Sequence, residues 1–371
     1  MLLVILASVV IAALGVGGYF VSTQEFRGAR NLLVEQRAFA VAEYGLNNEV
    51  SHWDSGRNLA PPGGMPIGAV DSTRRYVADG DTAYVKITRL TDNTFWVVSE
   101  GRTSMGFDMM ESLRRTNAYV RIAYPTIEPK GAITTAGEVK ITGAATVSGN
   151  DTPPAGWLAC GAPGPTVAAL MVAPTVTPDY KPGNILSTPA YERDPAAADS
   201  NTYVRYGSET WNSLAAGAEI QIPGGNYNWD IEPVKSGTNC VAGQKNWGEP
   251  WRAPKSGVVP ECEGRFPIIY VDGDLHLRGK GRGQGILLIN GSLELNGQFE
   301  FYGIIIARDN VDKGTGTAKV FGAIYARDAE LSDSFWAGTQ DVTFSRCAIE
   351  NALRGSAVLT RVSERHWSQL Y

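Results

Sequence analysis

Histidines are the first candidates for chemistry in this chain, because imidazole titrates near neutral pH and serves as catalytic base and metal ligand. The three histidines, His52, His276 and His366, lie far apart, and no H-E-x-x-H motif is present. No G-x-S-x-G motif, P-loop or strand-linked G-x-G-x-x-G motif occurs either. We therefore predict no catalytic residues, no metal ligands, no cofactor and no small-molecule substrate. A polysaccharide lyase is the main enzymatic alternative, and it would need Asp, Lys and Arg clustered on one face.

Two pairs of carboxylates could bind calcium. Asp272 and Asp274 flank a glycine, and Asp309 and Asp312 enclose Asn-Val. Position three of the second run is Val311, where an EF-hand loop needs an oxygen ligand. We therefore interpret these carboxylates as turn residues between strands.

The four cysteines, Cys160, Cys240, Cys262 and Cys347, form no C-x-x-C motif. The gap between Cys240 and Cys262 does not fit a zinc knuckle. One or two disulfides are expected, with buried free thiols as the alternative. Disulfides persist in oxidising compartments, so this expectation favours a body outside the cytoplasm.

Seven basic residues of the C-terminal half could bind DNA phosphates. They are Arg278, Lys280, Arg282, Arg308, Lys313, Lys319 and Arg327. The stretch from Arg265 to Arg327 has eight Lys or Arg against six Asp or Glu, and the chain has a formal net charge of −5. Solvated surface charges are the simpler interpretation, and DNA capture is the alternative.

Aromatic residues crowd the region 150–264. Exposed aromatic side chains bind sugars or proteins, whereas the packing of a loop-rich segment explains them equally well. A surface ligand is therefore a second possible partner. The residues are Tyr203, Tyr206, Trp211, Tyr227, Trp229, Trp247 and Trp251.

The elements that carry these residues begin with a long helix, predicted over 1–55. Met1–Val21 is apolar and uncharged, and Ser22–Val50 continues it without proline. At 1.5 Å per residue, 21 residues span about 31 Å, one hydrocarbon thickness. We predict that the first part lies in a membrane or in the core of a filament. The predicted core residues are Met1, Leu2, Leu3, Val4, Ile5, Leu6, Val9, Val10, Ile11, Leu14 and Phe20.

The orientation of this segment has competing interpretations. A cleaved signal peptide needs a positive n-region, which this segment lacks. Arg27, Arg30 and Arg37 follow the apolar run, so the positive-inside rule alone places the C-terminal side in the cytoplasm. The cysteines favour the opposite orientation, and we expect a removed leader whose charges hold the N-terminus inside.

A small antiparallel sheet is predicted over 56–124. Ala83–Arg89 and Thr94–Gly101 flank turn residues at Thr91–Asn93, which predicts a hairpin. Glu111–Tyr124 supplies a third strand with alternating apolar residues. In the preceding helix, one apolar face is predicted, with residues Phe26, Ala29, Leu33, Ala40, Tyr44 and Leu46.

An internal repeat fills the C-terminal half. Four blocks, Pro267–Gly273, Gly285–Gly291, Gly303–Asp309 and Gly322–Asp328, start 18, 18 and 19 residues apart. One such repeat cannot bury its apolar face, whereas stacked repeats can. The pattern predicts a parallel β-solenoid over 265–348, with an antiparallel β-meander as the alternative.

Outside the repeat, Gly137–Gly143 has the same shape as Gly273–Gly279, which predicts a first solenoid rung over 125–149. The region 150–264 is rich in Pro and Gly and contains three cysteines, so we interpret it as a loop-rich insertion. The solenoid is expected to end near Cys347, and the C-terminal closing segment, 349–371, to consist of a short helical stretch at Ala348–Leu353 and a strand-like tail. The expected fold class is α+β.

Arg37–Leu46, which contains the motif A-E-x-G-L, resembles the N-terminal segment of PilX-type minor pilins. Phe95–Gly101 followed by Arg114–Tyr124 is similar to the small sheet behind that helix. Phe299–Ala352 and the ending Arg365–Trp367 are similar to the β-solenoid tails of some of these proteins. The resemblance covers most of the chain outside 150–264.

This resemblance implies a non-enzymatic minor subunit of a type IV pilus or secretion pseudopilus. Such subunits wait in the bacterial inner membrane and then pack against major and minor pilins in an extracellular filament. Typical pilins have Glu at mature position five, where this chain has Ile5, which suits a tip or initiating subunit if Met1 lies near the mature start. The residues implied in subunit packing are Phe26, Leu33, Phe39, Glu43, Tyr44 and Leu46.

Three further interpretations accompany the resemblance. Glu43 could pair with Arg37 or with a neighbouring subunit. The alternative function is a DNA- or surface-binding minor pilin that acts in natural transformation or adhesion. A cytoplasmic bactofilin-like polymer would share the solenoid, but it explains neither the N-terminal segment nor the cysteines.

Overall fold

The computed structural model of the chain describes residues 1–51, 53, 65–76, 81–91, 94–105, 110–123, 125–157, 160–207, 209–236, 239–250, 262–312, 316–331, 340–356, 358–361 and 367–370. Two compact units are present. The first consists of Met1–Trp53, Met65–Ile122 and Leu359–Tyr371, and the second includes Ala123–Val358.

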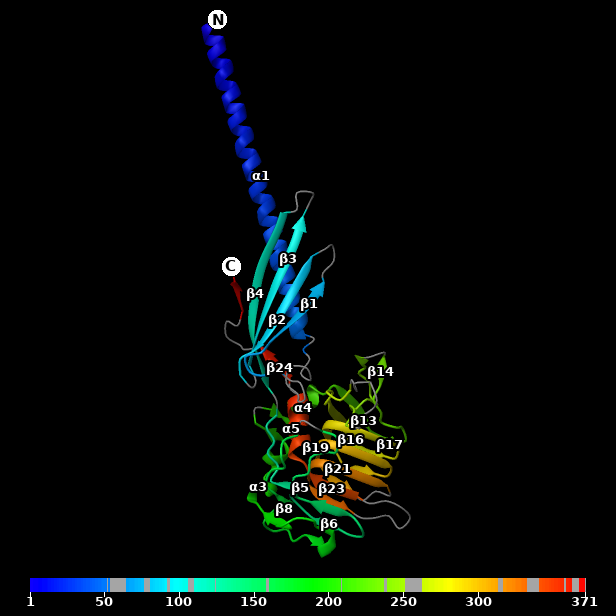
Figure 1. Cartoon of the computed structure of the whole chain (residues 1–371). Coiled ribbons are helices and arrows are strands. Elements are labelled where there is room, and N and C mark those ends of the chain that lie inside the picture. The colour runs from blue at the N-terminus through cyan, green and yellow to red at the C-terminus, as the bar shows by residue number, and fades with distance from the viewer. Residues whose placement is uncertain are drawn as a thin grey trace. The chain divides into compact units, whose positions relative to one another are not determined.

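One helix, α1 (Leu2–Ser51), runs unbroken for 50 residues in the first unit (Figure 1). No proline interrupts it, so every residue in the interior of the helix has the backbone N–H that the i to i−4 hydrogen bond needs. The prediction of one long, apolar N-terminal helix is therefore confirmed.

Four antiparallel strands lie beside the C-terminal half of α1 in the order β1-β2-β3-β4 (Figure 1). Ala83, Val85 and Ile87 are buried, whereas Lys86 between them is exposed, so the strands alternate as sheets with one covered face do. The predicted hairpin is confirmed, because Arg89 pairs with Phe95 and Ala83 with Gly101. The strands are β1 (Val70–Tyr76), β2 (Thr82–Arg89), β3 (Thr94–Met105) and β4 (Met110–Ala123).

The end of the chain joins this antiparallel sheet. Strand β25 (Trp367–Leu370) pairs with Arg115–Ala118 of β4, and β24 (Val358–Arg361) also borders β4. The tail is therefore made of strands, as expected from the sequence, and they belong to the antiparallel sheet. An edge strand of an antiparallel sheet offers unpaired backbone groups, and the tail satisfies them.

The second unit contains a large sheet in which every pairing given by the described strands is parallel. Equivalent glycines of successive repeats are register partners, Gly285 with Gly303 and Gly303 with Gly322. This pairing excludes the antiparallel meander. The repeat strands are β16 (Ile268–Leu277), β17 (Lys280–Ile289), β18 (Leu293–Leu295), β19 (Gln298–Ala307), β20 (Asn310–Asp312), β21 (Thr317–Ala326), β22 (Asp328–Leu331) and β23 (Gln340–Phe344).

The parallel strands form three ladders. Ladder A has the order β10-β8-β5-β21-β19-β17-β16-β13, ladder B has β16-β18-β20-β22-β6-β9, and ladder C has β17-β19-β21-β23-β7. Gly285, Gly303 and Gly322 have φ of 112°, 141° and 146°. A Cβ on Gly303 would collide with the carbonyl of Gly285 in the neighbouring strand, so these positions require glycine.

The predicted first rung lies beside the last repeat. Strands β5 (Gly131–Thr135), β6 (Val139–Ile141) and β7 (Thr146–Ser148) pair with β21, β22 and β23. The 125–149 segment has the predicted strand pattern, but its place in the stack is at the opposite end from the one that sequence order suggests. An incomplete parallel stack has unpaired edges at both ends, and sequence order does not decide which edge an additional strand takes.

The region 150–264 is not a loop excursion alone, because it extends the sheet at both ends. Strands β8 (Ala168–Val172), β9 (Asp179–Tyr180) and β10 (Tyr191–Arg193) continue beyond β5 and β6. Strand β13 (Ile220–Tyr227) pairs with β16 at the other end. The prediction of a loop-rich insertion was wrong in these four strands, which are outside the repeat and lack its spacing.

Short elements complete the second unit. A continuous core of Ile, Leu, Val and Phe side chains fills the space between the ladders, and α5 packs on β19 and β17. The remaining elements are η1 (Pro182–Asn184), α3 (Pro195–Ala198), η2 (Ser200–Tyr203), β11 (Arg205–Tyr206), β12 (Glu209–Thr210), α4 (Trp211–Ala216), β14 (Lys235–Ser236), β15 (Asn239–Cys240) and α5 (Arg346–Gly355).

Candidate functional site

The N-terminal half of α1 is the main candidate for a functional element, because it is both apolar and exposed. By length and composition α1 is able to cross a membrane, and none of its apolar stretch is buried within the chain. Such a surface is unstable in water unless lipid or protein covers it. The predicted residues Met1, Leu3, Val4, Ile5, Leu6, Val9, Val10, Ile11, Leu14 and Phe20 are all exposed, and the side chain of Leu2 lies outside the description.

The C-terminal half of α1 contacts the sheet through small residues. Ala38 and Ala42 are fully buried, and Val34 and Val41 are nearly so. Their spacing of three, four and seven residues places them on one face of the helix. This sheet-facing set differs from the apolar face predicted from sequence.

Close approach of helix and sheet explains the small residues. A Cβ on Gly45 would lie 2.5 Å from the Cβ of Ala83 and 2.7 Å from the Oγ of Ser99. On the opposing side, a Cβ on Gly101 would lie 2.5 Å from the backbone nitrogen of Ala42. The glycines allow the two backbones to approach closely, which bulkier residues would prevent.

The predicted apolar face remains largely uncovered. Phe26, Leu33 and Tyr44 are 71%, 55% and 51% exposed. With Tyr19, which is 73% exposed, they recur at seven-residue steps and then after eleven, so they form one stripe on a helix. We call Tyr19, Phe26, Leu33 and Tyr44 the outer stripe.

Two of the residues predicted to contact neighbouring subunits are placed differently. Leu46 is 8% exposed and is therefore buried within the first unit, so it is not available to a neighbour and that prediction was wrong. Phe39 is half-buried. The reason is helical geometry, since Leu46 lies two positions beyond Tyr44 and turns toward the sheet side.

Two ion pairs tie α1 to the sheet. The Nε of Arg37 lies 2.7 Å from the Oδ2 of the buried Asp81, and Glu35 lies 2.7 Å from Arg114 of β4. Arg37 therefore pairs with Asp81 and not with Glu43. No motif in the sequence marks Asp81 as the partner of Arg37, because the two residues are 44 positions apart.

Both disulfides form, and buried free thiols are excluded. Cys160 is bonded to Cys347, which lies in the first turn of α5, and Cys240 is bonded to Cys262. The first disulfide joins residues separated by 187 positions, and the second joins residues separated by 22. The sequence predicted disulfides but left their pairing open.

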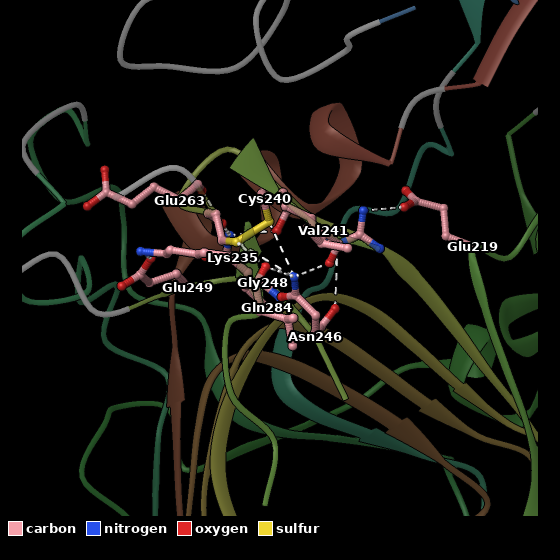
Figure 2. Close-up of a disulfide and its surroundings, with 12 residues drawn as sticks. Glu219, Lys235, Cys240, Val241, Asn246, Gly248, Glu249, Glu263 and Gln284 are labelled. Carbon is pink, nitrogen blue, oxygen red and sulfur yellow. Dashed lines mark hydrogen bonds and ion pairs between the residues drawn. A yellow bond between two sulfur atoms is a disulfide. The ribbon is translucent and has the colours of Figure 1, made fainter. Parts of the chain in front are cut away.

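A buried amide organises the surroundings of the second disulfide (Figure 2). Asn246 is fully buried, and its Nδ2 donates to the carbonyl of Val241 at 2.6 Å and contacts the sulfur of Cys240 at 3.3 Å. Gln284 of β17 donates from Nε2 to the carbonyls of Glu263 and Arg265 at 2.8 and 2.7 Å. The disulfide segment is thereby fixed to the repeat strands, which indicates a structural role.

Four ladder C positions alternate in charge, namely Arg282, Glu300, Lys319 and Asp341. Arg282 donates from Nε to Glu300 at 2.8 Å, and Lys319 lies in register between Glu300 and Asp341. The two cations are thus separated by one carboxylate and followed by another, so they do not form a basic row. Of the other predicted DNA-binding residues, Arg278 and Lys280 are exposed, and Lys313 lies outside the described residues.

The remaining two cations lie at turns beyond β19 and β21. Arg308 donates to Asn290 at 3.0 Å, and Arg327 pairs with Asp309 at 3.1 Å and with Asp328 at 3.0 Å. Neighbouring carboxylates raise the pKa of Arg327, chiefly through its hydrogen bond to Asp328. Cationic side chains that already pair with carboxylates bind DNA phosphates more weakly than unpaired cations do.

Carboxylates of the repeats bond across neighbouring strands, in agreement with their interpretation as turn residues. Asp274 accepts from the backbone nitrogen of Ser292 at 2.7 Å, and Asp272 accepts from Asn290 at 3.1 Å. Among the described residues no group of His, Cys, Asp and Glu could hold a metal ion. His276 lies 2.6 Å from Glu294, and His52 and His366 are outside the description.

The aromatic residues of 150–264 mainly pack the second unit. Tyr206, Trp211 and Trp247 are 2%, 4% and 0% exposed, and Tyr227 stacks on Trp229 at 4.8 Å. Packing therefore accounts for these residues better than a row of exposed rings does. Trp251 lies outside the described residues.

Comparison with known proteins gives no relative, since no protein-family model, no curated protein and no solved structure matches the chain. The function is therefore argued from the chain's own residues.

Proposed function

We propose that this protein is a minor subunit of a type IV pilus or a related secretion pseudopilus, and that it acts in filament assembly and surface display. The supporting observation is the division of α1. Its first half is apolar and uncovered, and its second half packs one face against a sheet. The outer stripe, which runs along both halves, remains exposed. The same apolar surface is stable in lipid before assembly and against other helices afterwards.

The partners in this proposal are other pilins, which pack against α1, and the inner membrane before assembly. The second unit lies outside the cytoplasm, where its two disulfides persist. We further propose that its three parallel ladders form a β-solenoid, because successive repeats pair in register and none of them buries its apolar face alone.

The size of the second unit supports a place at the filament tip. The second unit spans Ala123–Val358, and a shaft subunit would have to repeat this bulk at every helical step. A tip subunit meets no such conflict. A tag at Lys181, which is exposed on the second unit, should give gold labels at filament ends in electron micrographs. Labels spread uniformly along the shaft would reject the tip position.

The outer stripe gives the assembly test a matched pair of variants. Leu33→Asp places a charge in the stripe, whereas Asn31→Asp places it at an exposed position outside it. We expect the first to reduce filaments per cell at least tenfold and the second to leave them unchanged, at equal protein levels in the membrane fraction. Normal filaments with Leu33→Asp, or in a strain without the protein, would contradict the assembly role.

A further inference from the structure

A cleft of about 210 Å³ opens in the second unit between ladder A and the segment that covers its outer side. Its floor comes from three neighbouring strands, because Thr134 of β5 is the register partner of both Tyr325 of β21 and Met171 of β8. Its roof comes from α3, η2 and β11, with Ala197, Thr202 and Tyr206 among the lining residues.

The cover is held in place by its own hydrogen bonds. Tyr203 donates to the carbonyl of Ala197 at 2.8 Å, and Thr202 donates to the carbonyl of Ala196 at 2.6 Å. The ring of Tyr203 meets that of Tyr325 edge to face at 6.2 Å. The cleft is therefore a formed feature of the fold, and a ligand needs no rearrangement of the cover to enter it.

Two hydroxyl groups at the floor lack partners. Thr134 is 3% exposed and Tyr325 is 5% exposed, and within the described part of the chain neither side chain makes a hydrogen bond. Burial raises the pKa of Tyr325, so its hydroxyl stays protonated and able to donate. Neither hydroxyl belongs to the buried polar atoms without a partner, so both open onto the cleft, where a ligand is able to bond to them.

The charges at the mouth are balanced. Lys130 pairs with Asp194 at 2.8 Å, and Asp194 also accepts from the Ala196 nitrogen. Glu128 and Arg205 are exposed at the same mouth. Two cations and two anions leave no net charge to attract an ion, and a charged group at the uncharged floor would be poorly solvated.

We propose that this cleft binds one neutral monosaccharide unit of a surface glycan. Sugar hydroxyls both donate and accept, as the hydroxyls of Thr134 and Tyr325 do. Ala197 and Met171 offer apolar contacts to the C–H face of a pyranose ring. The volume is below that of sites for drug-sized molecules, so it admits a single ring rather than a buried chain.

Saturation-transfer NMR on the full-length protein tests this proposal. The micelles must consist of a detergent without a sugar headgroup, since such a headgroup would compete. The probes are glucose, galactose, mannose, N-acetylglucosamine and N-acetylgalactosamine, with glucuronate, glycine and lysine as charged comparisons. We expect at least one neutral sugar to receive saturation and to bind more tightly than the charged probes.

Isosteric variants connect binding to the cleft. Thr134→Val and Tyr325→Phe each remove one floor hydroxyl, and each should lower the affinity for the sugar about fivefold. Arg205→Gln changes only an exposed mouth residue and should also weaken binding. Tyr270→Phe, on the same ladder but outside the cleft, is the control and should leave affinity unchanged.

Four results would contradict the proposed sugar site. The proposal is overturned if no neutral sugar binds, if only the charged probes bind, or if Arg205→Gln and both floor variants bind sugar as tightly as the unmodified protein. Loss of binding in Tyr270→Phe would likewise place the sugar elsewhere. These outcomes are separate from filament assembly, because every variant lies in the second unit and none is a residue of α1.

Discussion

Gly101 of β3 and Ala42 of α1 approach so closely that a Cβ on the glycine would lie 2.5 Å from the alanine's backbone nitrogen. Gly101→Ala should therefore force helix and sheet apart and cost about 1–3 kcal/mol of unfolding free energy. Denaturant titration in micelles, followed by tryptophan fluorescence, measures this loss.

The matched control for that substitution is Gly28→Ala. A Cβ on Gly28 meets nothing within 4 Å, and alanine is the better helix former by about 1 kcal/mol. The control should therefore be neutral or stabilising. A loss of equal size in the two variants would show that the close approach of Gly101 to α1 does not decide the result.

Arg37 compensates the buried charge of Asp81. The carboxylate side chain is 4% exposed and the arginine side chain is 31% exposed, so Arg37→Ala leaves a charge without its partner. A buried pair broken on one side costs about 3–5 kcal/mol, which we reduce to about 2 kcal/mol for the partial exposure of Arg37.

A double-mutant cycle isolates this pair. Adding Asp81→Asn to Arg37→Ala should recover part of the loss, because the uncompensated charge is gone. Purely additive losses would mean that the two side chains do not interact in solution.

The two disulfides should contribute unequally to stability. In the chain-entropy model, separations of 187 and 22 residues correspond to about 5 and about 3 kcal/mol. Replacing Cys160 and Cys347 by alanine should therefore lower the unfolding free energy more than replacing Cys240 and Cys262. The reverse order in denaturant titrations would assign the dominant role to local packing around Asn246.

Asp312 should weaken the second unit at neutral pH. Burial, followed by the charges of Glu294 and Glu330, raises its pKa above 3.8. A carboxyl with a raised folded pKa binds its proton more tightly in the native state, so its penalty grows as pH rises through that pKa. Asp312→Asn should stabilise the protein by about 0.5 kcal/mol at pH 7, since Asp312 is only half-buried and solvent screens part of the repulsion.

The same variant has a pH signature. Well below 3.8, the ordinary pKa of an aspartate carboxyl, Asp312 is protonated in both the folded and the unfolded state, so the two proteins should have equal stability. Urea titrations at pH 3 and pH 7 give both differences. A stability gain of equal size at the two pH values would mean that packing, and not charge, is responsible.

The long helix and the parallel repeats could be predicted because their signals are local. An uninterrupted apolar run without proline has few structural alternatives, and glycines at 18-residue spacing mark equivalent positions in successive strands. Gly303 illustrates this, since its conformation and its contact with Gly285 both require the missing side chain.

The sheet-facing side of α1 could not be predicted from hydropathy. Phe26, Leu33 and Tyr44 have larger apolar side chains than Ala38 and Ala42, so a pattern search selects the wrong face. The distance between helix and sheet decides instead, and that distance depends on Gly45 and Gly101. Only the folded sheet makes the small residues recognisable as a contact surface.

The cleft was also beyond sequence analysis. Thr134 and Tyr325 are 191 residues apart by their numbers, and they meet because β5 pairs with β21. Tyr325 belongs to the repeat block Gly322–Asp328, but nothing in that block or around Thr134 marks a ligand site. The aromatic cluster of 150–264 pointed toward sugars, but most of its rings proved to be packing residues.

The pairing of β5–β7 with β21–β23 also sets an order of events during synthesis. The early strands are made roughly 200 residues before their partners, which at about 5–20 residues per second is a wait of about 10–40 s. Throughout that time their edges are open to pairing with other chains. The early strands therefore cannot complete their pairing until the last repeats have been made.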